Sequence, residues 1–185
     1  MPCAVGTGGS MTSHLRAGRY IHRGKCLCVA FDATTRCRAI QALWSAAEVA
    51  HLWHAAPAGS YAVPVPLQVS AWLQDQFRFG GLQYLPDPEY CDEWCSPSRT
   101  LARGYGDCDD FAILTASMLE AGGLSVWVLV GQYGEQGHAW VEGYDEAGRP
   151  FMIEPTSGGL FTVRPHGYHP QLLTNPRDCQ RAWVA

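Results

Sequence analysis

The segment Gly104-Tyr105-Gly106-Asp107-Cys108-Asp109-Asp110 predicts the start of a helix. Two glycines lead into Asp107, a residue type favoured at the N-cap, and Asp110 lies three positions further on, as in a capping box. The helix is predicted to extend to about Ala121, just before a pair of glycines that provides a stop signal. Its apolar side consists of residues at helical spacing, namely Phe111, Leu114, Met118 and Leu119. Cys108 is therefore expected in the first turn of this helix.

Cys108 at that position has the surroundings of a nucleophile. The unpaired backbone N–H groups and the positive end of the helix dipole favour thiolate over thiol. We therefore expect a depressed pKa for Cys108 and faster alkylation than at the other cysteines. Neighbouring carboxylates oppose this effect, so a cationic partner is required. A histidine fits best, because a Cys–His pair places a base within hydrogen-bonding reach.

Two predicted strands downstream supply that histidine and a carboxylate. Residues 138–144 and 150–154 have strand character and are joined by turn residues. A hairpin of this kind places His138 opposite residues 154 to 156. In one of these registers Glu154 directly faces His138 on the same side of the sheet, where Cβ atoms lie roughly 5 Å apart. Glu154 is thus predicted to orient the imidazole and to stabilise its protonated form.

Three motifs in this half of the chain resemble those of transglutaminase-like cysteine enzymes. They are Gly106-Asp107-Cys108-Asp109-Asp110-Phe111-Ala112, His138-Ala139-Trp140-Val141-Glu142 and Ile153-Glu154-Pro155-Thr156. The upstream segment Ser96-Pro97-Ser98-Arg99-Thr100-Leu101 is also similar to bacterial members. The resemblance covers about residues 69 to 156. It implies an α+β, papain-like fold in which the catalytic helix packs on an antiparallel sheet.

The resemblance also implies a catalytic triad of Cys108, His138 and Glu154, and an acyl-enzyme mechanism on amide or peptide substrates. The family usually has Asp as its third residue, so the longer Glu154 has to be accommodated. The glutamine that papain itself has shortly before its cysteine is missing here. For the oxyanion hole we expect the backbone N–H of Cys108 and a side chain between Trp72 and Gln83, with Gln83 favoured.

Hydrolysis is favoured over transfer to an amine, because no oxygen-ligand loop for Ca²⁺ marks a calcium-regulated transglutaminase. A protein cross-linking transglutaminase and a catalytically silent interaction module stay open as alternatives. The expected partner is a protein or peptide substrate, and no metal or other cofactor is expected.

The chain of 185 residues is long enough for one domain with an extension. Residues 1–60 are expected to form a partly mobile N-terminal extension that contributes a strand at 20–31 and a helix at 39–55. Residues 61–185 are expected to form the catalytic domain. Within it, we predict a second amphipathic helix over residues 69–77, a long loop over 85–103 and a buried strand over 125–130.

Composition excludes several classes of protein. Hydrophobic residues make up 47% of the chain and charged residues 16%, which is typical of a folded globular protein. The net charge is −4 and no run of Lys or Arg follows the chain, so nucleic acid is not an expected partner. No export signal and no apolar stretch of about 18 residues is visible, so no membrane association is expected. These features predict a cytoplasmic protein.

Eight cysteines are many for such a chain. Without an export signal, free thiols are the default interpretation. The alternative is a zinc site, although no common ligand spacing fits the candidate residues His22, Cys26, Cys28 and Cys37. Cys91 and Cys95 have the spacing of loop ligands, but no second pair completes that site.

Overall fold

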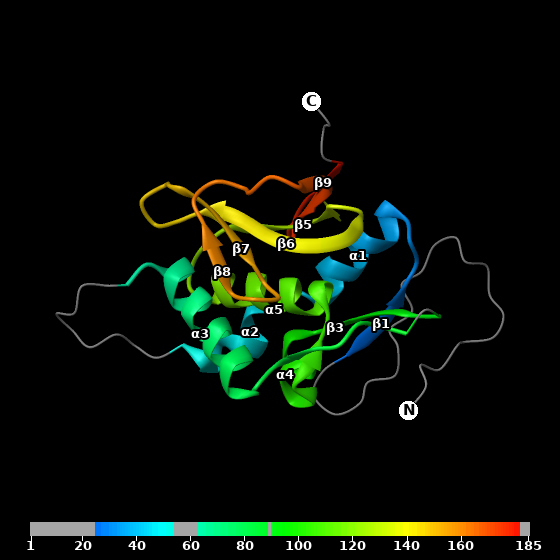
Figure 1. Cartoon of the computed structure of the whole chain (residues 1–185), viewed down its shortest axis with the longest axis horizontal. Coiled ribbons are helices and arrows are strands. Elements are labelled where there is room, and N and C mark those ends of the chain that lie inside the picture. Colours follow the sequence, from blue (N-terminus) through cyan, green and yellow to red (C-terminus); the bar gives the residue numbers. More distant parts are fainter. Residues whose placement is uncertain (1–24, 54–62, 89, 182–185) are drawn as a thin grey trace.

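The computed structural model, which describes residues 25–53, 63–88 and 90–181, is built around helix α5 (Cys108–Ala121). This helix has the bounds predicted from its capping and spacing. A six-stranded antiparallel sheet covers one side of α5, while the other helices pack on its remaining sides (Figure 1). The predicted α+β arrangement, with the catalytic helix packed on an antiparallel sheet, is confirmed.

The sheet has the strand order β10-β9-β5-β6-β7-β8. Its strands are β5 (Val126–Tyr133), β6 (Gln136–Tyr144), β7 (Pro150–Glu154), β8 (Gly159–Phe161), β9 (Tyr168–Thr174) and β10 (Cys179–Arg181). Strands β5 and β6 continue beyond their predicted ends and meet in a short turn at Gly134, where φ is +61°. The sequence pattern did not predict the last three strands.

The two faces of the sheet bury different sets of side chains, as expected for the period-two alternation of strands. One face packs against α5 through small and β-branched residues, including Val128, Val130, Val141 and Ile153. The other face carries a separate cluster of Leu129, Trp140, Met152 and Tyr168. Residues far apart in the chain are therefore fixed against each other on both faces.

The helix predicted over residues 39–55 is in fact three short pieces within the described residues. They are α1 (Ala33–Leu43), α2 (Ala46–Val49) and the 3₁₀ turn η1 (Ala50–Leu52). The first begins earlier than predicted, because the Asp32 side chain accepts a hydrogen bond of 2.9 Å from the Thr35 N–H.

Tertiary contacts explain why α1 and α2 do not form one helix. The Trp44 indole donates to Glu120 at 2.6 Å, and the Ser45 N–H donates to the Ser117 hydroxyl at 3.0 Å. Both acceptors lie on α5, so the contacts pull the chain out of helical geometry at residues 44–45. The pieces share one core with α5, since Ile40, Leu43 and Phe111 belong to the same buried cluster.

The long loop predicted over residues 85–103 contains regular structure, so that prediction is wrong. It includes strand β3 (Asp92–Cys95), which pairs with β1 (Cys26–Val29), and helix α4 (Pro97–Arg103). Proline in the first turn and Gly104 in the left-handed conformation bound this helix, as usual for short helices. Both elements are too short for a periodic pattern to reveal.

Helix α3 (Val65–Phe79) is longer than the predicted segment and ends at Gly80, where φ is +76°. After it, the two-residue strand β2 (Gln83–Tyr84) runs parallel to β4 (Tyr105–Gly106), directly before the start of α5. None of the helices in the described part of the chain is long and apolar enough to span a bilayer.

Six cysteines form disulfides, which contradicts the free-thiol interpretation. The pairs are Cys26–Cys95, Cys28–Cys91 and Cys37–Cys179. The zinc hypothesis is wrong as well, because three of its four cysteine and histidine ligands are used in these bonds and His22 lies outside the described residues. Strand pairing that sequence spacing cannot reveal brings these partners together. Among the described cysteines, Cys108 alone is free.

Candidate active site

Cys108 lies in the first turn of α5, as predicted. The Asp107 side chain caps the helix by accepting from the Asp109 N–H at 3.3 Å. The capping box, however, does not form. Asp110 instead accepts from the Cys95 N–H at 2.7 Å and from the Arg103 guanidinium. This carboxylate therefore ties the start of α5 to β3 and to the end of α4.

Gly106 is required by the same arrangement. A Cβ atom at this position would lie 2.7 Å from the Cβ of Asp110. A larger residue would therefore push Asp110 away from the Cys95 N–H and the Arg103 guanidinium. The glycine of the Gly-Asp-Cys motif thus serves the packing of the helix start.

The pKa of Cys108 is raised to about 12, by burial first and then by the charge of Asp107. The backbone N–H of Ala139 acts in the opposite direction by hydrogen bonding to the thiol. The predicted depressed pKa is therefore wrong, because burial and nearby acids outweigh the helix dipole. The resting form of Cys108 is a thiol, held beside the residue that follows His138.

His138 and Glu154 are in direct contact. The distance between His138 Nε2 and Glu154 Oε2 is 2.8 Å, and both side chains are largely buried. The observed hairpin register falls within the predicted range, at the end where His138 aligns with Thr156 and not with Glu154. Residue pairs such as Val141 with Ile153 place Glu154 across from Trp140, two residues from His138. The contact is thus diagonal, over a Cβ separation of roughly 7–8 Å in an antiparallel pair.

This diagonal separation explains the glutamate. A longer acidic side chain reaches a diagonal neighbour that a shorter one would not. The reason for the offset is the loop between β6 and β7, in which the Asp145 carboxylate accepts from the N–H groups of Ala147 and Arg149. Because this turn is wide, the first residue pair that flanks it is Tyr144 with Pro150.

Both oxygens of Glu154 have further hydrogen-bond donors. Oε1 accepts from the Thr156 N–H at 3.1 Å and from the Thr156 hydroxyl at 2.7 Å. Oε2 accepts from the Tyr168 hydroxyl at 2.7 Å. Burial acts to raise the pKa of Glu154, but His138, Thr156 and Tyr168 together lower it. Glu154 is therefore a carboxylate at neutral pH.

Aromatic rings surround the imidazole. Ring centroids of Tyr168, Tyr133 and Trp140 lie 5.9, 6.0 and 6.3 Å from that of His138. Tyr133 and Tyr168 stack at 4.4 Å. Sequence reasoning missed Tyr168, which comes from β9, and no local signal marks it. Thr156 follows Glu154 by two residues and belongs to the third motif, so its contact with the acid could have been predicted from the sequence.

Carboxylates also crowd the nucleophile. Ligand atoms of Asp107, Cys108 and Asp109 lie within 4.8 Å of one another, a spacing that would suit a metal ion. Asp109 Oδ1 is buried and has no hydrogen-bond partner among the described residues. Burial, followed by the charge of Asp107, raises the pKa of Asp109 well above its usual range. Both effects disfavour the charged form of Asp109.

A second cluster of possible metal ligands in the described residues consists of Cys26, Glu93 and Cys95. Its two sulfur atoms are joined in a disulfide, so it is not a metal site. The expectation of a cofactor-free protein stays a prediction.

Gln83, predicted for the oxyanion hole, is exposed on β2. Its backbone pairs with Tyr105, three residues before Cys108, and its N–H donates to the Gly104 carbonyl at 2.9 Å. The neighbouring Tyr84 lies close enough to Cys108 for the thiol to influence the pKa of its hydroxyl. The pKa of Tyr84 is raised to about 12 by burial and then by Cys108. The oxyanion role of Gln83 stays a prediction.

The fold and the arrangement of the site are similar to those of transglutaminase-like, papain-like cysteine peptidases. The EGTA-treated structure of Legionella pneumophila LapG matches with a TM-score of 0.50 and 23% identity, over 64% of this chain and 69% of LapG. The calcium-bound structure of LapG gives 0.49 and 23% identity, over 63% and 70%. LapG is a transglutaminase-like, papain-like cysteine protease.

The particular family model that matches is the CEP76 peptidase-like domain, over residues 92–175. The Centrosomal protein of 76 kDa from Xenopus tropicalis is 33% identical over 75 residues. This match includes 40% of the present chain but spans only 11% of the length of the frog protein. The resemblance inferred from the three motifs is thereby confirmed.

Proposed function

We propose that this chain is a cysteine hydrolase that cleaves amide or peptide bonds through a thioester on Cys108. One observation carries the proposal. His138 is hydrogen-bonded through Nε2 to the ionised Glu154 at 2.8 Å, while the next backbone N–H, of Ala139, contacts the Cys108 thiol. These two contacts support the assignment of a nucleophile, a base and an orienting acid in the order that acyl transfer requires.

In the acylation step His138 acts as a general base. Glu154 occupies Nε2, which leaves Nδ1 to accept the thiol proton as Sγ of Cys108 bonds to the substrate carbonyl carbon. The carbonyl electrons move to oxygen, and the imidazolium is stabilised by the Glu154 carboxylate. When the oxyanion collapses, the C–N bond breaks and the amine leaves with the proton from His138. The neutral resting thiol fits this concerted proton transfer.

Deacylation repeats these roles with water. His138 removes a proton from water, the oxygen attacks the thioester carbonyl, and Cys108 leaves as a thiol after regaining the proton. An amine in place of water would make the chain a transferase. We propose hydrolysis, and a protein or peptide as the substrate.

The disulfides are relevant to the cellular compartment in which the protein is active. A cytoplasmic location was predicted from the absence of an export signal and was consistent with free thiols, but six cysteines are paired. Such bonds persist mainly in oxidising environments. We propose that the active form is the one with these three bonds closed and Cys108 reduced. Counting thiols in native protein isolated without a reductant tests this.

The decisive experiment traps the acyl-enzyme. Wild-type protein is mixed with a panel of activated esters and peptide amides, quenched in acid and analysed by intact-mass spectrometry. We expect a mass increase equal to the acyl group that maps to Cys108 and is absent in Cys108→Ala. The assay is run in CaCl₂ and in EGTA, because LapG has been solved calcium-bound and EGTA-treated.

Three outcomes are distinguishable. An adduct whose loss is accelerated by a primary amine identifies a transferase. An adduct whose loss is insensitive to amines identifies a hydrolase. If no substrate gives an adduct while a protein partner binds equally to wild type and Cys108→Ala, the chain is an interaction module and the proposal fails.

A further inference from the structure

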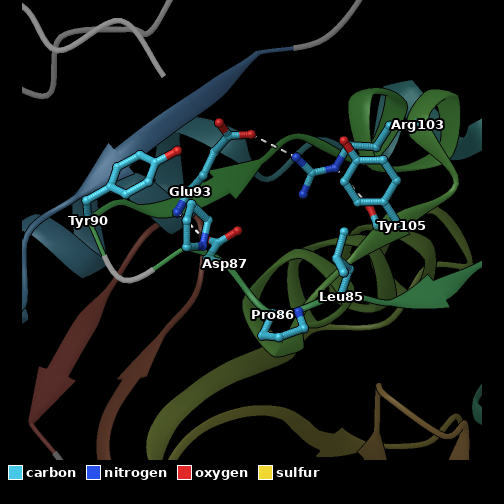
Figure 2. Close-up of a pocket in the computed structure, with 8 residues that line it drawn as sticks. Leu85, Pro86, Asp87, Tyr90, Glu93, Arg103 and Tyr105 are labelled. Carbon is cyan, nitrogen blue, oxygen red and sulfur yellow. Dashed lines mark hydrogen bonds and ion pairs between the residues drawn. The ribbon is translucent and has the colours of Figure 1, made fainter. Parts of the chain in front are cut away.

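A pocket with a volume of about 190 Å³ opens close to the start of α5 (Figure 2). Two prolines line it together with Leu85, Asp87, Tyr90, Glu93, Arg103 and Tyr105. Small-molecule sites usually have roughly 300–1,000 Å³. This pocket is therefore the size of a site for one side chain.

The walls of the pocket are continuous with the nucleophile. Leu85 follows β2, and its N–H donates to the Gly106 carbonyl at 2.8 Å. Tyr105 belongs to β4, which ends two residues before Cys108. A substrate whose carbonyl lies at Cys108 would thus place a neighbouring side chain along this part of the surface.

Among the described residues, the one basic side chain that lines the pocket is already neutralised. Arg103 donates to Glu93 at 2.8 Å, to the Tyr105 carbonyl at 2.8 Å and to the buried Asp110. Its guanidinium also lies over the Tyr105 ring at 4.8 Å. All three of its nitrogens are therefore used within the fold, and two carboxylates balance its single charge.

Asp87 is left without a balancing cation among the described residues. Its side chain lies near the middle of the lining residues in Figure 2, and Oδ2 accepts from the Glu93 N–H. Burial, and then the charge of Asp107, raise the pKa of Asp87 to about 7. The same acidic surroundings that disfavour a carboxylate here would favour a bound cation.

We propose that this pocket binds a cationic side chain of the substrate, lysine or arginine, next to the bond that Cys108 attacks. The proposal rests on the function proposed above and names its specificity. Asp87 provides the ion pair, and the exposed rings of Tyr90 and Tyr105 provide faces for the cation. Leu85 and the prolines pack against the methylene groups of the stem.

The test compares matched peptides. Each carries lysine, arginine, norleucine or glutamate at one position flanking the scissile bond, and kcat/KM is measured with wild-type protein. At one position we expect the cationic peptides to exceed norleucine on the order of tenfold, the size of one charge-assisted interaction. Asp87→Asn, which keeps the acceptor for the Glu93 N–H, should bring this ratio close to one.

Asp75→Asn is the matched control, because it removes an exposed carboxylate on α3 outside the pocket. It should leave the ratio at the wild-type value. A wild-type ratio near one, a preference for glutamate, or a ratio unchanged in Asp87→Asn would overturn the proposal.

If no peptide is turned over, the catalytic proposal fails and the pocket is still tested by binding. Fluorescence polarisation of the same peptides on Cys108→Ala should then show the tenfold preference for the cationic residue. Adding Asp87→Asn should remove that preference. Equal binding of the lysine and norleucine peptides would exclude the cation pocket independently of catalysis.

Discussion

Two carboxylates of the site are similarly buried, yet their pKa values move in opposite directions. Glu154 has 8% of its surface exposed and Asp109 has 6%. Glu154 accepts hydrogen bonds from Thr156 and Tyr168 and contacts His138, and its pKa is lowered. Asp109 has an oxygen without a partner and another acid beside it, and its pKa is raised. Donors, rather than depth, decide which buried acid stays charged.

The same contrast separates two parts of the site. The base side consists of His138, Glu154 and the side chains that contact them, and the nucleophile side consists of Cys108 and the residues that hold it. On the base side, hydrogen bonds from Thr156 and Tyr168 hold the Glu154 carboxylate in contact with His138. On the nucleophile side, Arg103, Asp110 and the disulfides hold a thiol among acids. The base side thus favours the charged form of its acid, whereas the nucleophile side favours the neutral form of Cys108.

Changing the charge of the base side should have the largest effect. Glu154→Gln should keep the fold and lower turnover by on the order of 10⁴, as for other triad carboxylates. Glu154→Asp restores the charge but not the reach, so we expect it to stay more than about tenfold below wild type. Steady-state kinetics with near-UV circular dichroism check both. Activity of Glu154→Gln within a few-fold of wild type would show that another group orients His138.

Removing the covalent supports of the nucleophile side should act on stability. The bonds Cys26–Cys95 and Cys28–Cys91 close nearly the same loop, with separations of 69 and 63 residues. Replacing all four cysteines by alanine should lower the free energy of unfolding by about 4 kcal/mol. Replacing one pair should cost much less, because the other pair still closes the loop.

Urea titrations of the two double variants and the quadruple variant measure these differences. Equal losses for one pair and for both would contradict the shared-loop argument. Thiol counts in the same samples provide the control. Cysteines that are still disulfide-bonded should not react with a thiol reagent before the protein unfolds.

Removing one donor of the base side should have a smaller effect on rate. Tyr168→Phe deletes the hydroxyl that donates to Glu154 Oε2, and we expect kcat to fall about tenfold. Because this bond lowers the pKa of Glu154, its loss should move the acid limb of the pH–rate profile to higher pH. Tyr133→Phe, on the stacked neighbouring ring, is the control and should leave the limb in place. An unshifted limb in Tyr168→Phe would contradict the assignment.

The smallest effect is expected at Asp109. Its pKa is raised in the fold, so the native state retains a proton that the unfolded chain releases above about pH 4. Stability from this group is complete below the unfolded pKa and is lost as pH rises toward the folded pKa. Asp109→Asn removes this dependence. The stability of this variant relative to wild type should therefore rise between pH 5 and pH 8. Urea midpoints at both pH values check it, and parallel curves would contradict it.

The amino-acid sequence was enough to predict the helix that begins at Cys108, the β6–β7 hairpin and the pairing of His138 with Glu154. The reason is that these features rest on local rules. Asp107 caps a helix whose apolar residues recur at helical spacing, and His138 and Glu154 fall on adjacent strands joined by a single loop. Such patterns need no knowledge of residues further away in the chain.

Only the tertiary structure decided the rest of the site, because each missing feature joins segments far apart in the chain. Tyr168 reaches Glu154 from β9, and Asp110 engages the Cys95 N–H on β3 rather than its own helix. The cysteines pair across 63 to 142 residues, and no spacing rule reveals such partners. Burial among acids likewise reversed the pKa shift expected for Cys108, since a helix dipole acts locally whereas desolvation depends on everything packed around the thiol.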